Sequence, residues 1–140
     1  MEQIVLDTNV LAAGLRSNRG TSFRLLQMIG TGRFELHISV AVVLEYEEVL
    51  KRMAPQFGLN HADIDDVLDY LCRVGIQHEI DFLWRPFLRD PDDDMLLELA
   101  VQAQCSAIVT HNLKDFAQAR LLGISAISPK TFLRKLGESP

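Results

Sequence analysis

Short apolar runs alternate along this chain with longer segments whose apolar residues recur at helical spacing. The runs rich in Ile, Val and Leu, which are typical of buried strands, cover residues 4–6, 34–38, 76–80, 107–110 and 124–127. Between these runs, apolar side chains three or four residues apart predict helices. Helices that connect successive strands favour parallel pairing, with helices on both faces of the sheet. The pattern therefore predicts a three-layer α/β/α fold around a mostly parallel sheet of four or five strands.

Polar residues indicate where several of these elements begin. Residues 11–15 are predicted to form one helical turn after the first strand. Thr21 or Ser22 can cap the next helix, and Ser39 can cap the helix after the second strand. Residues 82–89 are predicted to be irregular because no helical or strand period runs through them.

Composition narrows the classes of function. The 140 residues are 48% hydrophobic, which predicts one ordered domain over residues 1–140. The net charge of −5 argues against binding of nucleic acid by bulk positive charge, but it permits a nucleic-acid enzyme whose acidic site binds cations. The start of the chain is not basic, and no run of about 18 apolar residues occurs. We therefore expect a cytoplasmic protein without a membrane span, in which Cys72 and Cys105 are reduced thiols.

Four acidic residues occupy positions from which they can meet at the carboxyl ends of the predicted strands, where ligands bind to open parallel sheets. Asp7 ends the first strand, and Glu45 lies in the helix after the second. Asp93 lies in the first turn of the helix before the fourth strand, and Asp115 follows that strand closely. Each could equally be a helix cap, a turn residue or a solvated side chain. Their combination from separate segments is what predicts a site.

A cluster of carboxylates needs a counter-charge, because like charges repel and raise one another's pKa. No Lys or Arg lies within two residues of Asp7, Glu45 or Asp93. A hard divalent cation would relieve the repulsion. Mg²⁺ binds oxygen ligands octahedrally and leaves positions for phosphate oxygens, and such an ion can activate water. The chemistry that fits is hydrolysis of a phosphodiester bond.

Other catalytic patterns are missing from the sequence. The four histidines, at positions 37, 61, 78 and 111, have no partner at helical spacing and are predicted to be core or surface residues rather than zinc ligands. The chain has no G-x-S-x-G nucleophile motif, no Walker A loop and no G-x-G-x-x-G loop. An aspartyl phosphatase remains an alternative because a strand ends in Asp7, although Asn9 stands where that chemistry commonly has a second acid.

Several motifs, in order along nearly the whole chain, resemble those of the PIN-domain ribonucleases. They are Leu-Asp-Thr-Asn-Val-Leu at 6–11, Ser39 followed by Glu45 on a helix, Asp-Pro-Asp-Asp-Asp at 90–94, and Val-Thr-His-Asn at 109–112 followed by Asp115-Phe116. The most similar branch is that of bacterial PIN proteins related to the VapC toxins of toxin–antitoxin systems. The resemblance implies a PIN-like fold and a nuclease that depends on Mg²⁺ or Mn²⁺ and acts mainly on single-stranded or structured RNA. It also implies a homodimer and a cognate antitoxin whose peptide plugs or flanks the acidic pocket.

The resemblance also assigns roles by position. The acidic quartet of the family, which is catalytic and binds the metal, corresponds to Asp7, Glu45, Asp93 and Asp115, with Asp94 in reserve for Asp93. Asp7, Glu45 and Asp93 would hold a first ion, and Asp115 would tune it or help to bind a second. The polar residues that support the quartet correspond to Asn9, Thr110 and Asn112. The position of Asn112 is Asp in many members of this branch and Asn in the VapC branch, so one potential anionic ligand is missing and a strict second metal site is in question.

Binding of RNA to an acidic protein requires local positive charge. Three arginines follow the first strand on the expected active end, and other basic residues are further candidates for phosphate contacts; the set comprises Arg16, Arg19, Arg24 and Lys114, together with Lys51, Arg52, Arg85 and Arg89. Each can also be an ordinary solvated charge. The main alternative to an active ribonuclease is a catalytically inactive PIN-like module that binds RNA or a protein partner, an alternative favoured by Asn112 and by the scarcity of basic residues.

Overall fold

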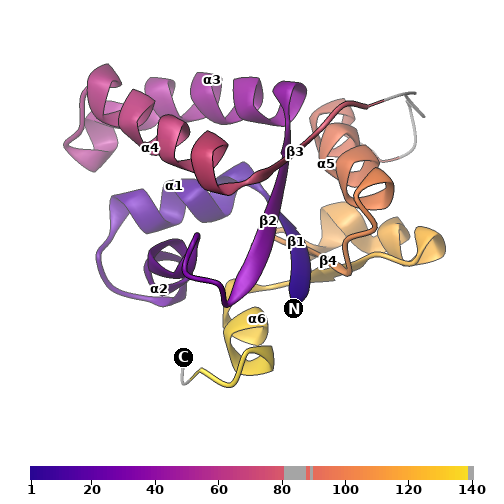
Figure 1. Ribbon diagram of the computed structural model, residues 1–140. Helices are drawn as coiled ribbons and strands as arrows, with labels where there is room; N and C mark the ends of the chain where they lie inside the picture. Colours follow the sequence, from indigo (N-terminus) through magenta and orange to yellow (C-terminus); the bar gives the residue numbers. More distant parts are fainter. Residues whose placement is uncertain (81–87, 89, 139–140) are drawn as a thin grey trace.

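The computed structural model, which describes residues 1–80, 88 and 90–138, has a three-layer α/β/α architecture around one parallel sheet (Figure 1). The strands are β1 (Glu2–Leu6), β2 (Phe34–Ser39), β3 (Ile76–His78), β4 (Ala107–Val109) and β5 (Ser125–Ile127). Their order is β3-β2-β1-β4-β5, and every neighbouring pair is parallel. The predicted fold class is confirmed, with all five strands in one sheet.

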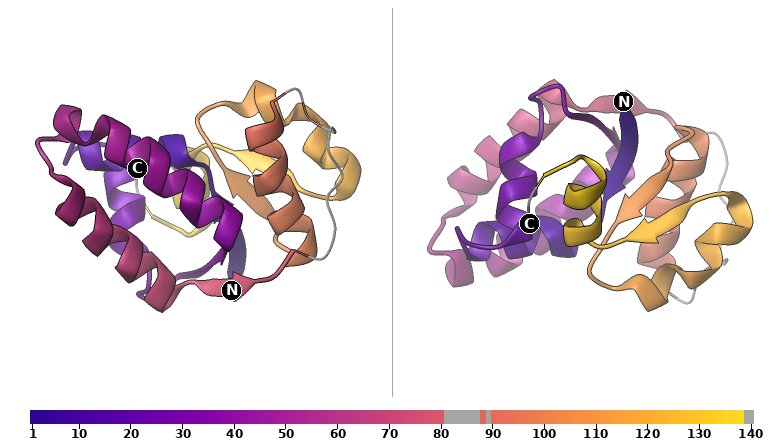
Figure 2. Two further views of the ribbon diagram at one scale, coloured as in Figure 1. Left: turned by 90° about the horizontal axis from the view of Figure 1, so that it is seen from above. Right: turned by 90° about the horizontal axis from the view of Figure 1, so that it is seen from below.

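The helices cover both faces of this sheet. They are α1 (Thr8–Arg16), α2 (Thr21–Met28), α3 (Val40–Phe57), α4 (His61–Val74), α5 (Pro91–Gln102), the 3₁₀ segment η1 (Leu113–Leu122) and α6 (Pro129–Lys135). Figure 2 shows α3 and α4 on one side of the sheet and α5 on the other. Helix α1 packs against α2 and α3, and η1 packs against β5. Burial on both faces explains why β1 and β4 are continuous apolar runs rather than alternating ones.

The middle strand β1 determines where a site can form. Ile4, Val5 and Leu6 are fully buried, and β1 pairs with β2 on one side and β4 on the other. The chain that leaves β1 therefore emerges between the chain that leaves β2 and the chain that leaves β4. In parallel sheets this carboxyl edge is where residues distant in sequence meet.

The residues that cap the helices agree only in part with those predicted from the sequence. The Ser39 hydroxyl accepts a hydrogen bond from the Val42 amide at 3.3 Å, as expected for an N-cap. The cap of α2, however, is Gly20 at φ +96°, and Thr21 and Ser22 already lie inside the helix. The Ser22 hydroxyl is instead 2.8 Å from Nε2 of His111, a contact between distant segments.

Helix α1 is longer than the single turn predicted for residues 11–15. It begins at Thr8, directly after β1, because the Val10 amide donates to the Asp7 carbonyl at 3.0 Å. The buried face formed by Val10, Leu11 and Gly14 holds the full helix against its neighbours. Burial therefore overrides the weak helix propensity of Thr and Asn at its start.

Some expectations concern residues outside the described set. Residues 82–87 and 89, which were predicted to be irregular, belong to that group, as do Arg85 and Arg89. Within the described residues, no helix combines the length and the apolarity needed to cross a bilayer. Cys72 and Cys105 are both free thiols, as predicted.

The fully buried Tyr46 ties α3 to the end of β1. Its hydroxyl donates to the Leu6 carbonyl at 2.5 Å, one residue before Asp7. This bond fixes the distance between the start of α3 and the carboxyl end of the middle strand.

We expect Tyr46→Phe to lower the free energy of unfolding by about 1–2 kcal/mol, because a buried carbonyl loses its donor. Tyr70→Phe is the matched control. The Tyr70 hydroxyl also donates to a carbonyl, that of Ile29 at 2.7 Å, but this tyrosine is 38% exposed and water can replace the bond. Urea denaturation of the two variants checks the prediction, and equal losses would contradict it.

Candidate active site

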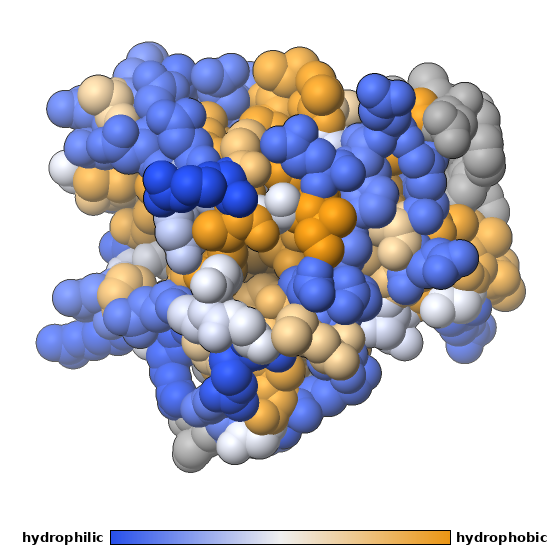
Figure 3. All heavy atoms as spheres, viewed as in Figure 1, coloured by the Kyte–Doolittle hydropathy of each residue, from blue (hydrophilic) through white to orange (hydrophobic). Residues whose placement is uncertain are grey.

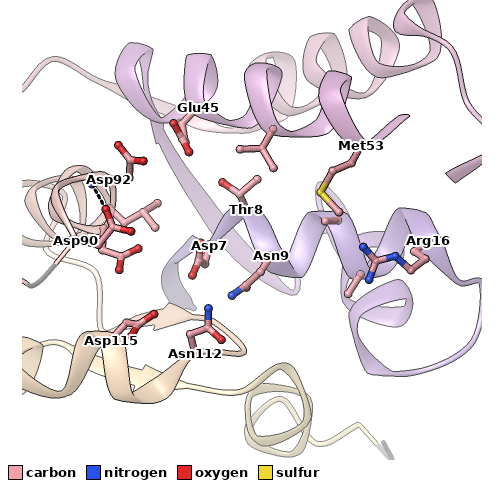
Figure 4. Close-up of a pocket in the computed structure, with 15 residues that line it drawn as sticks. Asp7, Thr8, Asn9, Arg16, Glu45, Met53, Asp90, Asp92, Asn112 and Asp115 are labelled. Carbon is pink, nitrogen blue, oxygen red and sulfur yellow. Dashed lines mark hydrogen bonds between the residues drawn. The ribbon is translucent and has the colours of Figure 1, made fainter. Parts of the chain in front are cut away.

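A pocket of about 320 Å³ opens at the carboxyl end of β1. Its described lining includes six carboxylates, which come from four parts of the chain: Asp7, Glu45, Asp90, Asp92, Asp93 and Asp115. Figure 4 shows Asp7 near the centre of the pocket, with Glu45, Asp90, Asp92 and Asp115 around it. Arg16 is the single basic side chain among the described residues that line the pocket.

Each carboxylate is placed by the element that carries it. Asp7 is the N-cap of α1, and Glu45 lies on α3 after β2. Asp93 lies in the first turn of α5, and Asp115 lies in the first turn of η1, after β4. Because β2 and β4 flank β1, the segments that follow them bring Glu45 and Asp115 to opposite sides of Asp7. The four carboxylates predicted to converge therefore line one pocket.

A hydrogen-bond network orients the Asp7 carboxylate. Asp7 is 9% exposed, and the buried Thr110 hydroxyl donates to its Oδ2 at 2.8 Å. The same hydroxyl accepts from the Asn112 amide at 3.0 Å and from Nδ2 of Asn9 at 3.5 Å. Oδ1 of Asn9 accepts from the His111 amide at 3.3 Å. The three residues expected to support the quartet thus link the end of β1 to the segment after β4.

The pocket disfavours ionised carboxylates. Burial raises the pKa of Asp7, although the hydrogen bond from Thr110 opposes this effect. Burial also raises the pKa of Asp93 from 3.8 to about 7, with further contributions from the charges of Asp7, Asp90 and Asp115. The pKa of Glu45 is raised by burial and then by Asp92. Negative charge is therefore concentrated here beyond what the described side chains neutralise.

The structure distinguishes Asp93 from its neighbour Asp94. Asp93 lines the pocket, whereas Asp94 is 2% exposed and its Oδ1 accepts from the Leu88 amide at 2.7 Å. Successive residues of a helix point about 100° apart, so the two carboxylates cannot share one direction. Asp94 holds the start of α5 against residue 88 and does not line the pocket.

Two pocket carboxylates, Asp90 and Asp92, were not among the predicted site residues. Asp90 is the N-cap of α5, and its Oδ1 accepts from the Asp92 amide at 2.9 Å. The acidic run 90–94 is the sequence feature that could have indicated them, because a helix that starts at the edge of a pocket exposes several first-turn residues to it. The rotation of the helix, which selects among them, was not available from the sequence.

The basic residues proposed for RNA contacts differ in their surroundings. Arg16 lines the pocket, and Arg19 and Lys114 are exposed. Arg24 pairs with Glu138 at 3.3 Å, and Lys51 pairs with Asp65 at 2.8 Å and with a second acid on its own helix. Arg52 pairs with Glu48 at 3.5 Å. Ion pairs within the protein thus engage three of these six described candidates.

The donor chemistry of the pocket fits a hard divalent cation. Carboxylate oxygens are the ligands that Mg²⁺ and Mn²⁺ prefer, and a bound cation would favour the ionised forms of Asp7 and Asp93, whose pKa values burial raises. Across the part of the chain that the structure describes, no three acidic, His or Cys side chains are grouped tightly enough to form a ready-made metal centre. The pocket therefore supplies suitable ligands that are not drawn together into a closed cage.

Comparison with known proteins identifies the class to which this fold and pocket belong. The sequence profile of the PIN domain matches residues 3–114, which is most of the chain. The protein therefore belongs to the PIN-domain family. A comparison with curated proteins gave no match.

Two solved structures have a similar fold. One is VapBC2 from Rickettsia felis bound to a DNA fragment from their promoter, with a TM-score of 0.61 and 14% identity over 90% of this chain and 98% of that chain. The other is VapBC-1 from nontypeable Haemophilus influenzae, with a TM-score of 0.60 and 16% identity over 91% of this chain and 98% of that chain. At these identities the similarity concerns the fold.

The raised pKa of Asp93 predicts a pH dependence of stability in the presence of a chelator. The folded protein keeps the Asp93 proton up to about pH 7, whereas the unfolded chain releases it near 3.8. The stabilising contribution is therefore complete below about pH 4 and is lost as the pH rises through about 7. We expect Asp93→Asn to remove this loss and to exceed the wild-type protein in unfolding free energy at pH 8 by about 1 kcal/mol, a figure reduced for solvent screening.

Thermal or urea unfolding between pH 4 and pH 8 measures this effect. Asp69→Asn, at an exposed position of α4, is the control for the loss of one negative charge. The same pH profile in the wild-type protein and in Asp93→Asn would show that Asp93 does not titrate in this range.

Proposed function

We propose that this protein is a metal-dependent endoribonuclease that hydrolyses RNA phosphodiester bonds and is the toxin of a toxin–antitoxin pair. The observation that carries the proposal is the convergence of six carboxylates in one pocket with Arg16 as the single basic residue in its described lining. Membership in the PIN-domain family supports it, because PIN domains are generally nucleases. The proposed unit of function is a single PIN domain over residues 1–140.

The pocket residues have different roles in the proposed reaction. Asp7, Glu45 and Asp93 would hold the cation, with Asp115 beside it, all within the pocket. A bound Mg²⁺ or Mn²⁺ supplies positive charge that lowers the pKa of a water molecule and polarises a phosphoryl oxygen. The Thr110 hydroxyl donates to Oδ2 of Asp7 and thereby restricts the orientation of this carboxylate.

The protonation states of the pocket carboxylates follow from their pKa values. Asp93, whose pKa is raised to about 7, can be neutral at physiological pH when no cation compensates its neighbours. Positive charge nearby favours its ionised form. Metal binding is therefore expected to release protons and to strengthen as the pH rises toward 8.

Besides the acidic pocket, which its peptide is expected to plug or flank, the proposed antitoxin would contact a second surface. An apolar hollow of about 320 Å³ lies between α1, α2 and α4, and its lining includes Leu15, Leu26, Val67 and Tyr70. The acidic residue Asp66 also lines this hollow. The two similar solved structures are of VapBC assemblies, which supports a partner of this kind. A segment with apolar side chains flanked by basic residues would match the hollow.

We expect Asp7→Asn to abolish RNA cleavage, with a loss of about a hundredfold or more, because an anionic ligand leaves the centre of the pocket. The fold should be retained and its stability raised, since burial disfavours the Asp7 charge. The assay uses a mixed RNA pool with Mg²⁺, Mn²⁺ or a chelator, and calorimetry follows Mn²⁺ binding. Asp69→Asn serves as the control.

Four results would oppose this assignment. Wild-type cleavage that persists in chelator would exclude the metal, and an active Asp7→Asn variant would exclude the pocket. RNA binding without cleavage in either metal would favour the inactive PIN-like module. Trapping of a phosphorylated Asp7 would instead favour the aspartyl phosphatase.

We also propose a homodimer, supported by an apolar patch beside the edge strand β3. Val40 and Leu44 of α3 are 72% and 57% exposed, and they border a hollow of about 430 Å³. Figure 3 shows apolar side chains gathered over this end of α3. A second copy of the chain would bury them.

Sedimentation at micromolar concentration tests the dimer. The wild-type protein should have twice the monomer mass, and Leu44→Asp should be monomeric because a charge enters the apolar contact. Leu121→Asp, at a position of η1 that is 71% exposed, should stay dimeric. A monomeric wild-type protein would refute the dimer.

A further inference from the structure

The acidic pocket continues as a trough along two helices. Residues at spacing i, i+4 and i+8 on α1, namely Thr8, Ala12 and Arg16, form one side of the trough. Glu45, Val49 and Met53 repeat the same spacing on α3 and form the other side. Since residues four apart share a helix face, both helices present one continuous stripe to the same space.

The chemistry changes along this trough. Near the sheet the lining is acidic, whereas farther along α1 the floor is made of Ala12 and Ala13. Val49 and Met53 form an apolar wall there, and the guanidinium of Arg16 lies at the outer end (Figure 4). The small alanine side chains leave the space between the helices open.

Arg16 differs from the basic residues whose charge is engaged in an ion pair. Arg24 and Arg33 both pair with Glu138, and Lys135 pairs with Glu2. Arg16 makes no ion pair with any side chain that the structure describes, although the pocket it lines is rich in carboxylates. The length of α1 explains this, because nine residues at about 1.5 Å each separate Arg16 from Asp7 at the start of the helix.

We propose that the outer half of the trough is a binding subsite for one unpaired nucleotide that flanks the scissile phosphate. Its base or ribose lies over Ala13 against Met53, and Arg16 donates hydrogen bonds to the next phosphate. The subsite rests on the proposed function, since the acidic end is where the scissile phosphate would lie. A subsite for an unpaired nucleotide would favour single-stranded over double-stranded substrates.

The size and composition of the trough support this occupant. The whole pocket, its acidic end included, holds about 320 Å³, at the lower end of the range for small-molecule sites, so its outer part matches the size of a single base or ribose. A methionine sulfur makes favourable contacts with aromatic rings, and a nucleobase presents such a face. Ala12, Ala13, Val49 and Met53 offer no side-chain hydrogen bonds to base edges. The subsite therefore accepts any base.

Binding of short oligonucleotides tests the subsite without relying on cleavage. Fluorescence anisotropy compares a single-stranded uridine hexamer with an abasic hexamer that has the same phosphates, in Ca²⁺ and in chelator, with intactness of the RNA checked on gels. Arg16→Ala removes the phosphate contact, and Ala13→Leu fills the floor. Arg134→Ala, at an exposed position of α6, is the control for the loss of one positive charge.

The expected results differ between the two variants. Arg16→Ala should weaken binding of both hexamers about tenfold and reduce the slope of log K against log salt by about 0.7, the value for one contact with a single strand. Ala13→Leu should remove the preference of the wild-type protein for the hexamer that carries bases. Arg134→Ala should bind both hexamers as the wild-type protein does.

Parallel cleavage assays in Mg²⁺ separate this inference from the proposed function. If the wild-type protein binds with the expected variant effects but cuts no RNA, the subsite stands and the ribonuclease does not. If the wild-type protein cuts RNA and both variants have its KM and its affinity, the subsite is refuted and the ribonuclease stands. Failure of the wild-type protein to bind either hexamer, or equal affinity for both, also refutes the subsite.

Discussion

Repulsion among carboxylates at the end of a parallel sheet is the constraint on which the rest of this structure depends. Among the described residues, six of them line one pocket, and burial and mutual charge raise the pKa of Asp93 to about 7. Repulsion among these carboxylates lowers the stability of the fold, and contacts elsewhere in the structure offset that loss. The buried core around β1 and the hydroxyl of Tyr46 keep the end of the middle strand fixed while the charges oppose one another.

Thr110 connects this constraint to the chemistry of the site. One hydroxyl bonds Asp7, the Asn112 amide and the Asn9 side chain, so the ends of β1 and β4 share one polar junction. The contact of Ser22 with His111 adds α2 to the same junction. Side chains that approach the pocket from different elements are thus positioned by neutral groups.

The order of strands and helices was predictable because apolar runs and helical periods are local properties of the sequence. The convergence of Asp7, Glu45, Asp93 and Asp115 followed from their places at strand ends, since parallel topology brings such ends together. The rotation of α5, which directs Asp93 outward and Asp94 inward, depends on packing against residue 88. The bond between Ser22 and His111 joins residues distant in sequence, and the full length of α1 depends on burial of its face against neighbouring helices.

The N-termini of α1 and α5 both border the acidic pocket. Aligned peptide dipoles give each helix start a partial positive charge of about half an elementary unit, and this charge stabilises nearby anions. The backbone thereby compensates some of the negative potential that basic side chains leave uncompensated. On the proposed function, an approaching phosphate would meet these dipoles as well as the carboxylates, and the dipoles would offset part of the repulsion from the side chains.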